Sequence, residues 1–310
     1  MSMRDARTVI GRPARMAALV MTVAMFVAAC GGSSASVSPS PSASADTSCA
    51  PENLALKTPG VLTLSTDNPA YSPWFQGGNE GADVWIGDYN NDPANGEGYE
   101  GAVAYAIAEQ LGFSPDKVTW IVTAFDQSFA PGDKAFDLFL NQVSIKADRA
   151  EAVDFSQGYY DVAQGVVTVE GSPIAGATSI ADLKGAKLGT QIGTTSYDAI
   201  VNVIAPDQEP AVFNTMDEAV AALQAGQIDG VVADVPTTFY MRDAQLDGGV
   251  IVGQLSGTGA GAEQFGVVLQ KGSPLTACVN AAIDALKANG TLDALLLEWI
   301  GGTGSAPVIQ

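Results

Sequence analysis

The chain contains no histidine, and after Arg15 it has only two arginines, Arg149 and Arg242. The lack of histidine excludes Ser-His-Asp and Cys-His catalysis, histidine-ligated zinc and imidazole acid–base chemistry. Basic residues are few altogether, because 14 Lys and Arg stand against 34 Asp and Glu and give a net charge of −20. This acidic balance argues against nucleic acid or anionic lipid as a binding partner.

The first residues have the pattern of an export signal. Four arginines precede an apolar run at 16–29 that only Thr22 interrupts. A transmembrane helix needs roughly 20 apolar residues, so this run is too short to span a bilayer. We therefore expect residues 1–29 to be a signal peptide. Its removal takes away four arginines and Asp5 and changes the net charge from −20 to −23.

The end of this run, Val27-Ala28-Ala29-Cys30, resembles a lipobox in which Cys30 is acylated, for example with palmitate. The alternative is an ordinary signal peptide with an incidental cysteine. Residues 30–52 are rich in Ser, Pro, Gly and Ala and cannot bury a core, so we expect a flexible tether. The protein would then be exported and held at the outer face of the cell membrane by its lipid anchor alone.

Two further cysteines, Cys49 and Cys278, would lie in an oxidising compartment. We expect them to form a disulfide bond that joins the start of the folded body to the C-terminal helical region. The alternative is two free, buried thiols.

After residue 52 the chain is long enough for two lobes of ordinary domain size. Short apolar runs alternate with helical patterns, which favours mostly parallel sheets covered by helices. The expected strands are 61–65, 118–122, 136–143, 187–190 and 228–233. The expected helices are 99–111, 196–204, a helix capped by Thr215 and ended by Gly226, 274–289 and 292–300.

The segment from Gln142 to Tyr160 contains Arg149. Because so few guanidinium groups remain in this acidic chain, we expect Arg149 to have a specific role. Guanidinium binds a carboxylate through two parallel hydrogen bonds. The alternative is a surface ion pair with Asp148, Glu151 or Asp154.

This segment, QVSIKADRAEAVDFSQGYY, resembles the signature of the family 3 extracellular solute-binding proteins, the polar amino-acid receptors of ABC importers. The residues in register are Ser144, Ile145, Asp148, Arg149, Val153, Asp154, Phe155, Ser156, Tyr159 and Tyr160. Two positions depart from the pattern, because Gln142 replaces a small residue and Lys146 replaces a threonine. The resemblance runs from about residue 54 to residue 300.

The resemblance implies a two-lobed, type II periplasmic-binding-protein-like α/β fold with two mostly parallel sheets and two hinge strands. Lobe I would comprise 53–162 and 260–310, and lobe II would comprise 163–259. The outward crossing would lie near 161–165 and the return near 256–263, where the glycine-rich SGTGAGAE can flex.

The resemblance also implies which residues bind the α-carboxylate of an amino acid. Arg149 and Ser144 would bind it from one lobe. Thr195, in a Gly-Thr-Thr turn, would bind it from the other, where N–H groups at a helix start attract anions. On spacing alone, a Gly-Thr-Thr turn is usually a simple helix N-cap.

Asp234 matches the family aspartate that receives the α-ammonium group, and it alternatively caps the helix beginning at Pro236. Asp67 and Tyr71 match a region that contacts the ligand side chain. A carboxylate beside aromatic rings suits a cationic or polar side chain, although the same residues suit lobe packing. We also place Gln142 in the ligand-binding set.

The loop at 76–98 is rich in Gly, Asn and acidic residues. Asp88, Asn90 and Asp92 have the spacing that opens an EF-hand loop. However, Pro93 stands where glycine is needed and Tyr99 where the bidentate glutamate belongs, so we expect no metal there. We also expect no cofactor, and we interpret the loop as a surface or cleft-rim feature.

Together these features predict a monomeric binding protein that closes on a free amino acid and delivers it to the permease subunits of an ABC importer. It would not be an enzyme. The alternatives are a dehydratase-like enzyme on the same scaffold and a ligand-sensing module. Without histidine, an enzyme would have to draw its acid or base from Asp67, Asp234, Lys146 or Tyr71.

Overall fold

The computed structural model describes residues 47–78, 85, 91–258, 263–301 and 306–310. The expected signal peptide, Cys30 and most of the tether lie outside these residues. So do Asp88 and Asn90 of the rejected calcium loop and part of the expected return crossing. None of the helices within the described ranges has the length and apolar character needed to cross a membrane.

The first sheet has the strand order β2-β1-β3-β12-β4. Its strands are β1 (Leu62–Thr66), β2 (Val118–Val122), β3 (Leu138–Phe139), β4 (Val153–Phe155) and β12 (Val268–Gln270). β1 pairs in parallel with β2 and β3, whereas β12 pairs antiparallel with β3 and β4. The polypeptide therefore reaches this sheet from two distant parts of the sequence.

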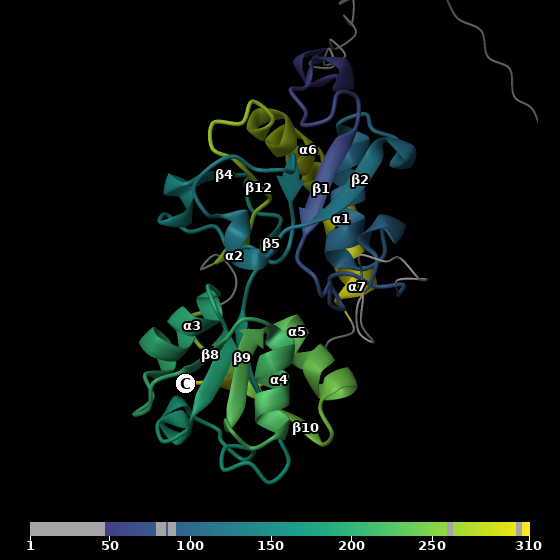
Figure 1. The fold of residues 1–310 in the computed structure, drawn as a ribbon. Coiled ribbons are helices and arrows are strands. Elements are labelled where there is room, and N and C mark those ends of the chain that lie inside the picture. The colour runs from purple at the N-terminus through teal and green to yellow at the C-terminus, as the bar shows by residue number, and fades with distance from the viewer. Residues whose placement is uncertain (1–46, 79–84, 86–90, 259–262, 302–305) are drawn as a thin grey trace, which may run out of the picture. The chain divides into compact units, whose positions relative to one another are not determined.

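The helices of this lobe are α1 (Tyr99–Gln110), α2 (Phe125–Ser128), α6 (Thr276–Ala288) and α7 (Thr291–Trp299). Figure 1 shows α1 and α6 beside the strands of the first sheet. The helix expected from the apolar spacing of 99–111 is confirmed as α1, and Gly112 follows it with φ +85°. Short 3-10 turns lie at Thr47–Cys49, Pro51–Asn53, Pro93–Asn95, Pro115–Lys117 and Arg149–Glu151.

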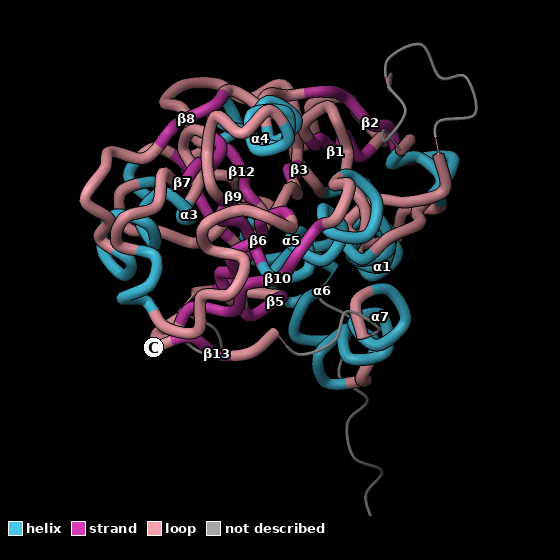
Figure 2. The backbone as a smooth tube through the Cα atoms, turned by 90° about the horizontal axis from the view of Figure 1, so that it is seen from below, coloured by secondary structure: helices cyan, strands magenta, loops and turns pink. Residues whose placement is uncertain are grey.

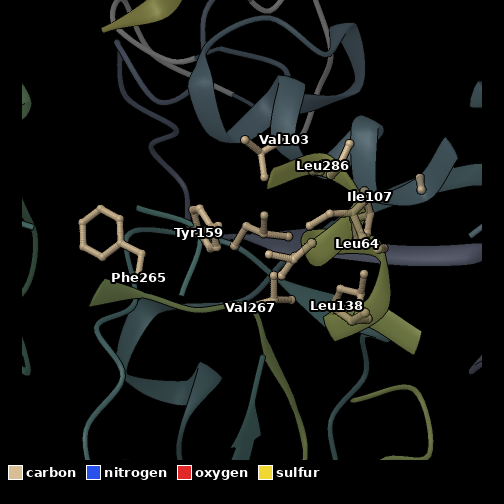
Figure 3. Close-up of a cluster of buried hydrophobic side chains, with 14 of the residues drawn as sticks. Leu64, Val103, Ile107, Leu138, Tyr159, Phe265, Val267 and Leu286 are labelled. Carbon is tan, nitrogen blue, oxygen red and sulfur yellow. The ribbon is translucent and has the colours of Figure 1, made fainter. Parts of the chain in front are cut away.

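The core of this lobe packs aliphatic side chains of β1, β3 and α1 against aromatic rings. In Figure 3, Tyr159 lies between Phe265 and the aliphatic cluster that includes Leu64. Cys49 and Cys278 are joined by a disulfide, with their Cα atoms 5.5 Å apart. This bond connects the first described residues to helix α6.

The second sheet has the strand order β13-β10-β6-β9-β7-β8, and Figure 2 shows these strands following one another across the lobe. Its strands are β6 (Gln164–Val169), β7 (Leu188–Gln191), β8 (Ala211–Phe213), β9 (Gly230–Asp234), β10 (Gly249–Leu255) and β13 (Val308–Ile309). Its helices are α3 (Thr195–Ala199), α4 (Met216–Gln224) and α5 (Val235–Tyr240), with π-helical turns at Ile200–Ile204 and Met241–Gln245 and a 3-10 turn at Ile180–Leu183.

Two short strands connect the sheets. β5 (Tyr160–Asp161) and β11 (Gln264–Phe265) pair antiparallel, with Phe265 opposite Tyr160 and Gln264 opposite Asp161. The outward and returning segments of the chain therefore lie side by side where they pass between the lobes. Paired crossing strands of this kind can absorb the backbone rotation of a hinge.

Three expectations about the fold need correction. The strand expected at 136–143 contains only β3, and near its expected end Gln142 has a left-handed backbone (φ +50°) that turns the chain out of an extended path. The sheets are mixed rather than mostly parallel, because β6 pairs antiparallel with β9 and β10, and β12 pairs antiparallel with β3 and β4. Finally, β13 pairs with β10 and buries Ile309, so the last residues belong to the second sheet and not to lobe I.

Candidate ligand-binding site

One cavity between the two lobes brings together every residue expected to bind ligand. The seven that line it are Asp67, Tyr71, Gln142, Ser144, Arg149, Thr195 and Asp234. Its empty volume is about 720 Å³, including the part open to solvent. The cavity lies beyond the carboxyl ends of β1, β3, β7 and β9, which is where open α/β sheets bind ligands.

Arg149 is buried, with 6% of its surface exposed, in the 3-10 turn that follows β3. Its Nη1 donates to the Ser144 carbonyl at 2.8 Å and its Nη2 to the Gly193 carbonyl at 2.7 Å. Its guanidinium carbon lies 4.4 Å from the centre of the Phe129 ring. These contacts hold the guanidinium between the two lobes in a partly apolar setting.

The surface ion pair considered for Arg149 is wrong. Among the described residues, no carboxylate oxygen lies within 4.0 Å of the guanidinium, and Asp154 pairs instead with Lys271 at 3.3 Å. Burial lowers the pKa of Arg149, but arginine stays protonated in proteins. The side chain is thus a buried positive charge that can gain a carboxylate partner.

Two hydroxyl groups lie beside this charge. Ser144, which is 2% exposed, donates to the Glu263 carboxylate, and its Oγ lies 3.3 Å from Thr195 Oγ1. Thr195 is the first residue of α3, and the N-cap position belongs to Thr194, whose side chain makes no capping hydrogen bond. The N-cap alternative for this turn therefore does not involve the Thr195 side chain.

Asp234 ends β9 on the second lobe. Its Oδ1 accepts a hydrogen bond from Gln164 Nε2 at 2.7 Å. Burial raises the pKa of Asp234 well above its usual range, and the nearby Glu263 charge raises it further. Its side chain makes no capping bond to α5, so the capping alternative is wrong. A cation beside Asp234 would favour the ionised carboxylate.

Asp67 and Tyr71 line the cavity from the segment after β1. Burial raises the pKa of both side chains, and the charge of Asp217 raises that of Tyr71 further. The Tyr71 hydroxyl is buried and makes no hydrogen bond within 3.5 Å, although Asp217 lies close enough to affect its pKa. The Tyr71 ring also packs against the second-lobe core, so cavity lining and lobe packing both apply to it.

Several residues in the cavity wall or in contact with it were not expected from the sequence. Phe125 lines the wall beside Arg149, and Glu263 accepts the Ser144 hydroxyl from the returning hinge. Glu100 lies behind the wall and accepts hydrogen bonds from Gln142. Of these three residues, only Glu100 could have been found from the sequence pattern. Its spacing from Val103 and Ile107 places this acid on the apolar face of a predicted helix.

A comparison with protein families matches residues 87–302 to "Bacterial extracellular solute-binding proteins, family 3". The chain is 32% identical over 200 residues to an L-arginine-binding protein of Pseudomonas aeruginosa, which covers 62% of this chain and 75% of the relative. The chain therefore belongs to family 3 of the bacterial extracellular solute-binding proteins.

Solved structures agree with this assignment. An ancestral arginine-binding protein bound to glutamine superposes with a TM-score of 0.63 at 28% identity, covering 79% of this chain and 99% of that one. An ancestral amino acid-binding protein described as a precursor of cyclohexadienyl dehydratase gives a TM-score of 0.60 at 27% identity, covering 77% and 95%. The two-lobed, type II periplasmic-binding fold expected from the sequence is confirmed.

Proposed function

We propose that this protein captures a free polar or cationic amino acid between its lobes and delivers it to the permease subunits of an ABC importer. The observation that carries the proposal is the pairing of Arg149 and Asp234 on one cavity, one from each lobe. Arg149 binds the α-carboxylate together with Ser144 and Thr195, and Asp234 binds the α-ammonium group. A ligand that bridges both lobes stabilises the closed state through the contacts it makes only there.

The charges of the cavity support a cationic side chain. Among the described lining residues, Arg149 is the only base, and Asp67 and Asp234 are the acids. A zwitterionic backbone adds no net charge, so one positive charge on the ligand side chain would balance the second acid. Asp67 and Tyr71 are the residues that would meet it. The relatives support the same class, because they include proteins named as arginine-binding.

The same proposal extends to the location and organisation of the protein. We infer that residues 1–29 direct export, that Cys30 is acylated and that the folded body works as a monomer on its tether. Lobe I would comprise 53–162 and most of 260–310, and lobe II would comprise 163–259 together with β13. The extracellular character of the family supports export.

An enzyme on this scaffold is the second candidate, because one similar structure is a precursor of a dehydratase. The acids of the cavity with raised pKa values, Asp67 and Asp234, are the groups that such an enzyme would use. We favour a binding protein over an enzyme, because the relative and the two solved structures described above are themselves named as binding proteins.

A thermal-shift screen of the purified protein against the common amino acids tests the proposal. We expect one or a few polar or cationic amino acids to raise the melting temperature, since a ligand that binds only the folded state stabilises it. Mass spectrometry of the recovered ligand should show it unchanged. A chemically altered product would support the enzyme, and no stabilisation by any amino acid would contradict the proposal.

A further inference from the structure

Glu100 is a buried acid behind the cavity wall. It is the second residue of α1, and none of its surface is exposed. A buried carboxylate requires a cation or several hydrogen-bond donors to stay ionised. In the part of the chain that the structure describes, no Lys or Arg nitrogen lies within 4.0 Å of it, so hydrogen-bond donors alone satisfy it.

Three donors reach this carboxylate, and two of them belong to Gln142. The Gln142 backbone N–H donates to Oε1 at 2.7 Å, and the Gln142 side-chain Nε2 donates to Oε2. The third donor is the Tyr159 hydroxyl, which bonds to Oε1. Glu100 therefore ties α1 to the turn after β3 and to the segment that enters the hinge.

The chemistry of the pair fixes the direction of the Gln142 amide. An ionised carboxylate only accepts hydrogen bonds, so it must face the amide nitrogen and not the amide oxygen. The same nitrogen also donates to Asn141 Oδ1 at 3.2 Å. Both N–H groups of the side-chain amide are then used. The side-chain carbonyl oxygen of Gln142 has no hydrogen-bond partner among the described residues, and Gln142 lines the cavity.

The backbone of Gln142 gives a second reason for this contact. Its φ of +50° is a left-handed conformation that residues other than glycine rarely adopt. The hydrogen bond from its backbone N–H to Glu100 helps to hold that conformation. Gln142 stands where the family pattern has a small residue, and both its backbone and its side chain donate hydrogen bonds to the buried Glu100.

We propose that Glu100 is a positioning residue that fixes the amide of Gln142, so that the cavity presents the Gln142 carbonyl oxygen to a hydrogen-bond donor of the ligand. The assignment rests on the proposed function, because it concerns how the same cavity recognises an amino acid. The ligand class it selects carries an N–H donor at this wall. Glu100 itself does not touch the ligand.

The proposal makes ligand affinity depend on pH near neutrality. Burial raises the pKa of Glu100 from 4.5 to about 7. The titratable groups that face it are Tyr159, which donates to it, and Tyr99 and Asp234, whose pKa values it raises. Helices α6 and α7, which pack on α1, place no ionisable group in hydrogen-bond contact with it within the described ranges. Below about pH 7 a protonated Glu100 no longer requires the amide nitrogen, so Gln142 can rotate and the affinity falls.

Calorimetric titration with L-arginine at about pH 8 and about pH 6 tests this assignment. If the screen above selects another amino acid, that amino acid is the probe. We expect Glu100→Gln to weaken binding about tenfold at pH 8, the size of one hydrogen bond to a charged group. The loss of affinity between pH 8 and pH 6 should also be smaller in the variant than in the unmodified protein, because the variant lacks the Glu100 carboxyl group that titrates in this range.

Glu109→Gln is the matched control, because Glu109 is an exposed acid on the same helix. The proposal is overturned if Glu100→Gln and this control share one affinity and one pH profile. Circular dichroism checks that each variant is folded. If Glu100→Gln does not fold, Gln142→Gly decides, since it should weaken binding and flatten the pH profile, and unchanged binding would overturn the proposal.

The experiments distinguish failure of the proposed function from failure of the role assigned to Glu100. If the unmodified protein binds no amino acid in the screen, the proposed function fails and this assignment fails with it. If the unmodified protein binds and the variants do not differ from the control, only the role of Glu100 fails.

Discussion

Arg149 carries the central interaction at the scale of single residues. We expect Arg149→Ala to weaken amino-acid binding by roughly 100- to 1,000-fold, because removing one partner of a buried charge pair costs about 2–5 kcal/mol. Isothermal titration calorimetry measures this loss. Arg242→Ala is the matched control, because Arg242 pairs with its neighbour Asp243 and does not line the cavity. A loss below about fivefold for Arg149→Ala would remove this residue from the site.

Asp234 tests the opposite end of the ligand. We expect Asp234→Asn to weaken binding by a similar factor, because the neutral amide cannot pair with an ammonium group. Asp243→Asn, a change of the same kind at an exposed acid outside the cavity, should leave calorimetric affinity unchanged. If Asp234→Asn also binds with unchanged affinity, the ammonium group is held elsewhere.

Glu100 should make the stability of the protein depend on pH. Its folded pKa of about 7 lies above the ordinary value of 4.5, so the folded state binds this proton more tightly than the unfolded state. Its contribution to the free energy of unfolding is therefore most favourable below about pH 4.5 and is lost as pH rises towards 7. By about pH 8 the loss amounts to roughly 3 kcal/mol.

Urea unfolding of the unmodified protein and of Glu100→Gln measures this contribution. We expect the variant to gain unfolding free energy relative to the unmodified protein at pH 8 but not at pH 4. An equal difference at both pH values would mean that Glu100 is not the titrating group. A gain in stability at pH 8 alone, together with the weaker ligand binding expected above, would show that the ionised Glu100 costs stability but supports binding.

At the scale of structural elements, the disulfide fixes the start of the folded body. Cys49 and Cys278 are separated by 229 residues in the sequence, and their bond ties a 3-10 turn to α6. Removing such a bond costs about 2–5 kcal/mol. We expect the double variant Cys49→Ala/Cys278→Ala to melt at a lower temperature yet to bind ligand with unchanged affinity, because the bond lies outside the cavity.

Intact-mass measurement provides a direct check of the same element. The unmodified protein should gain the mass of two hydrogen atoms on reduction, and the double variant should gain none. An unmodified protein whose mass does not change would show that the two thiols are free.

The sequence predicted some elements well and others poorly, for physical reasons. The ends of α1 and β2 were predicted to within one residue. Periodic apolar positions and the glycine at Gly112 mark α1, and a short apolar run marks β2. The strand at 136–143 was overextended, because nothing in the residue type shows that Gln142 adopts a left-handed backbone. The pairing of β13 with β10 joins distant segments that share no local pattern, so the sequence did not indicate it.

The binding site likewise contains residues that the sequence predicted and residues that it did not. The seven residues predicted to bind ligand lie in short local motifs of the sequence, and all seven line the cavity. Glu263 was not, because its role depends on the return of the chain beside Ser144 after more than a hundred residues. Contacts made by the fold rather than by a local motif are the ones that sequence patterns miss.

At the scale of the whole folded body, polar contacts join the two lobes around the cavity. Lys146 Nζ lies 2.6 Å from Asp198 Oδ2 on α3, and Trp74 Nε1 donates to Thr237 Oγ1 on α5 at 2.8 Å. These contacts stabilise the closed arrangement, and opening must break them. The first is a salt bridge that contributes at most about 1 kcal/mol because it is partly exposed.

We expect Lys146→Thr, which restores the residue typical of the family pattern, to speed ligand dissociation about two- to fivefold and to make it less sensitive to salt. Stopped-flow measurement of tryptophan fluorescence can follow the release. Lys271→Thr is the control, because Lys271 pairs with Asp154 within one lobe. Equal dissociation rates for both variants would show that the Lys146 bridge does not hold the lobes together.

The crystal structure of the protein with the amino acid selected by the thermal-shift screen tests the account most directly. We predict that the α-carboxylate lies within hydrogen-bond distance of the Arg149 guanidinium and that the α-ammonium group bonds to the Asp234 carboxylate across the cavity. An amino acid bound outside this cavity, or bound with neither group in contact, would contradict the account.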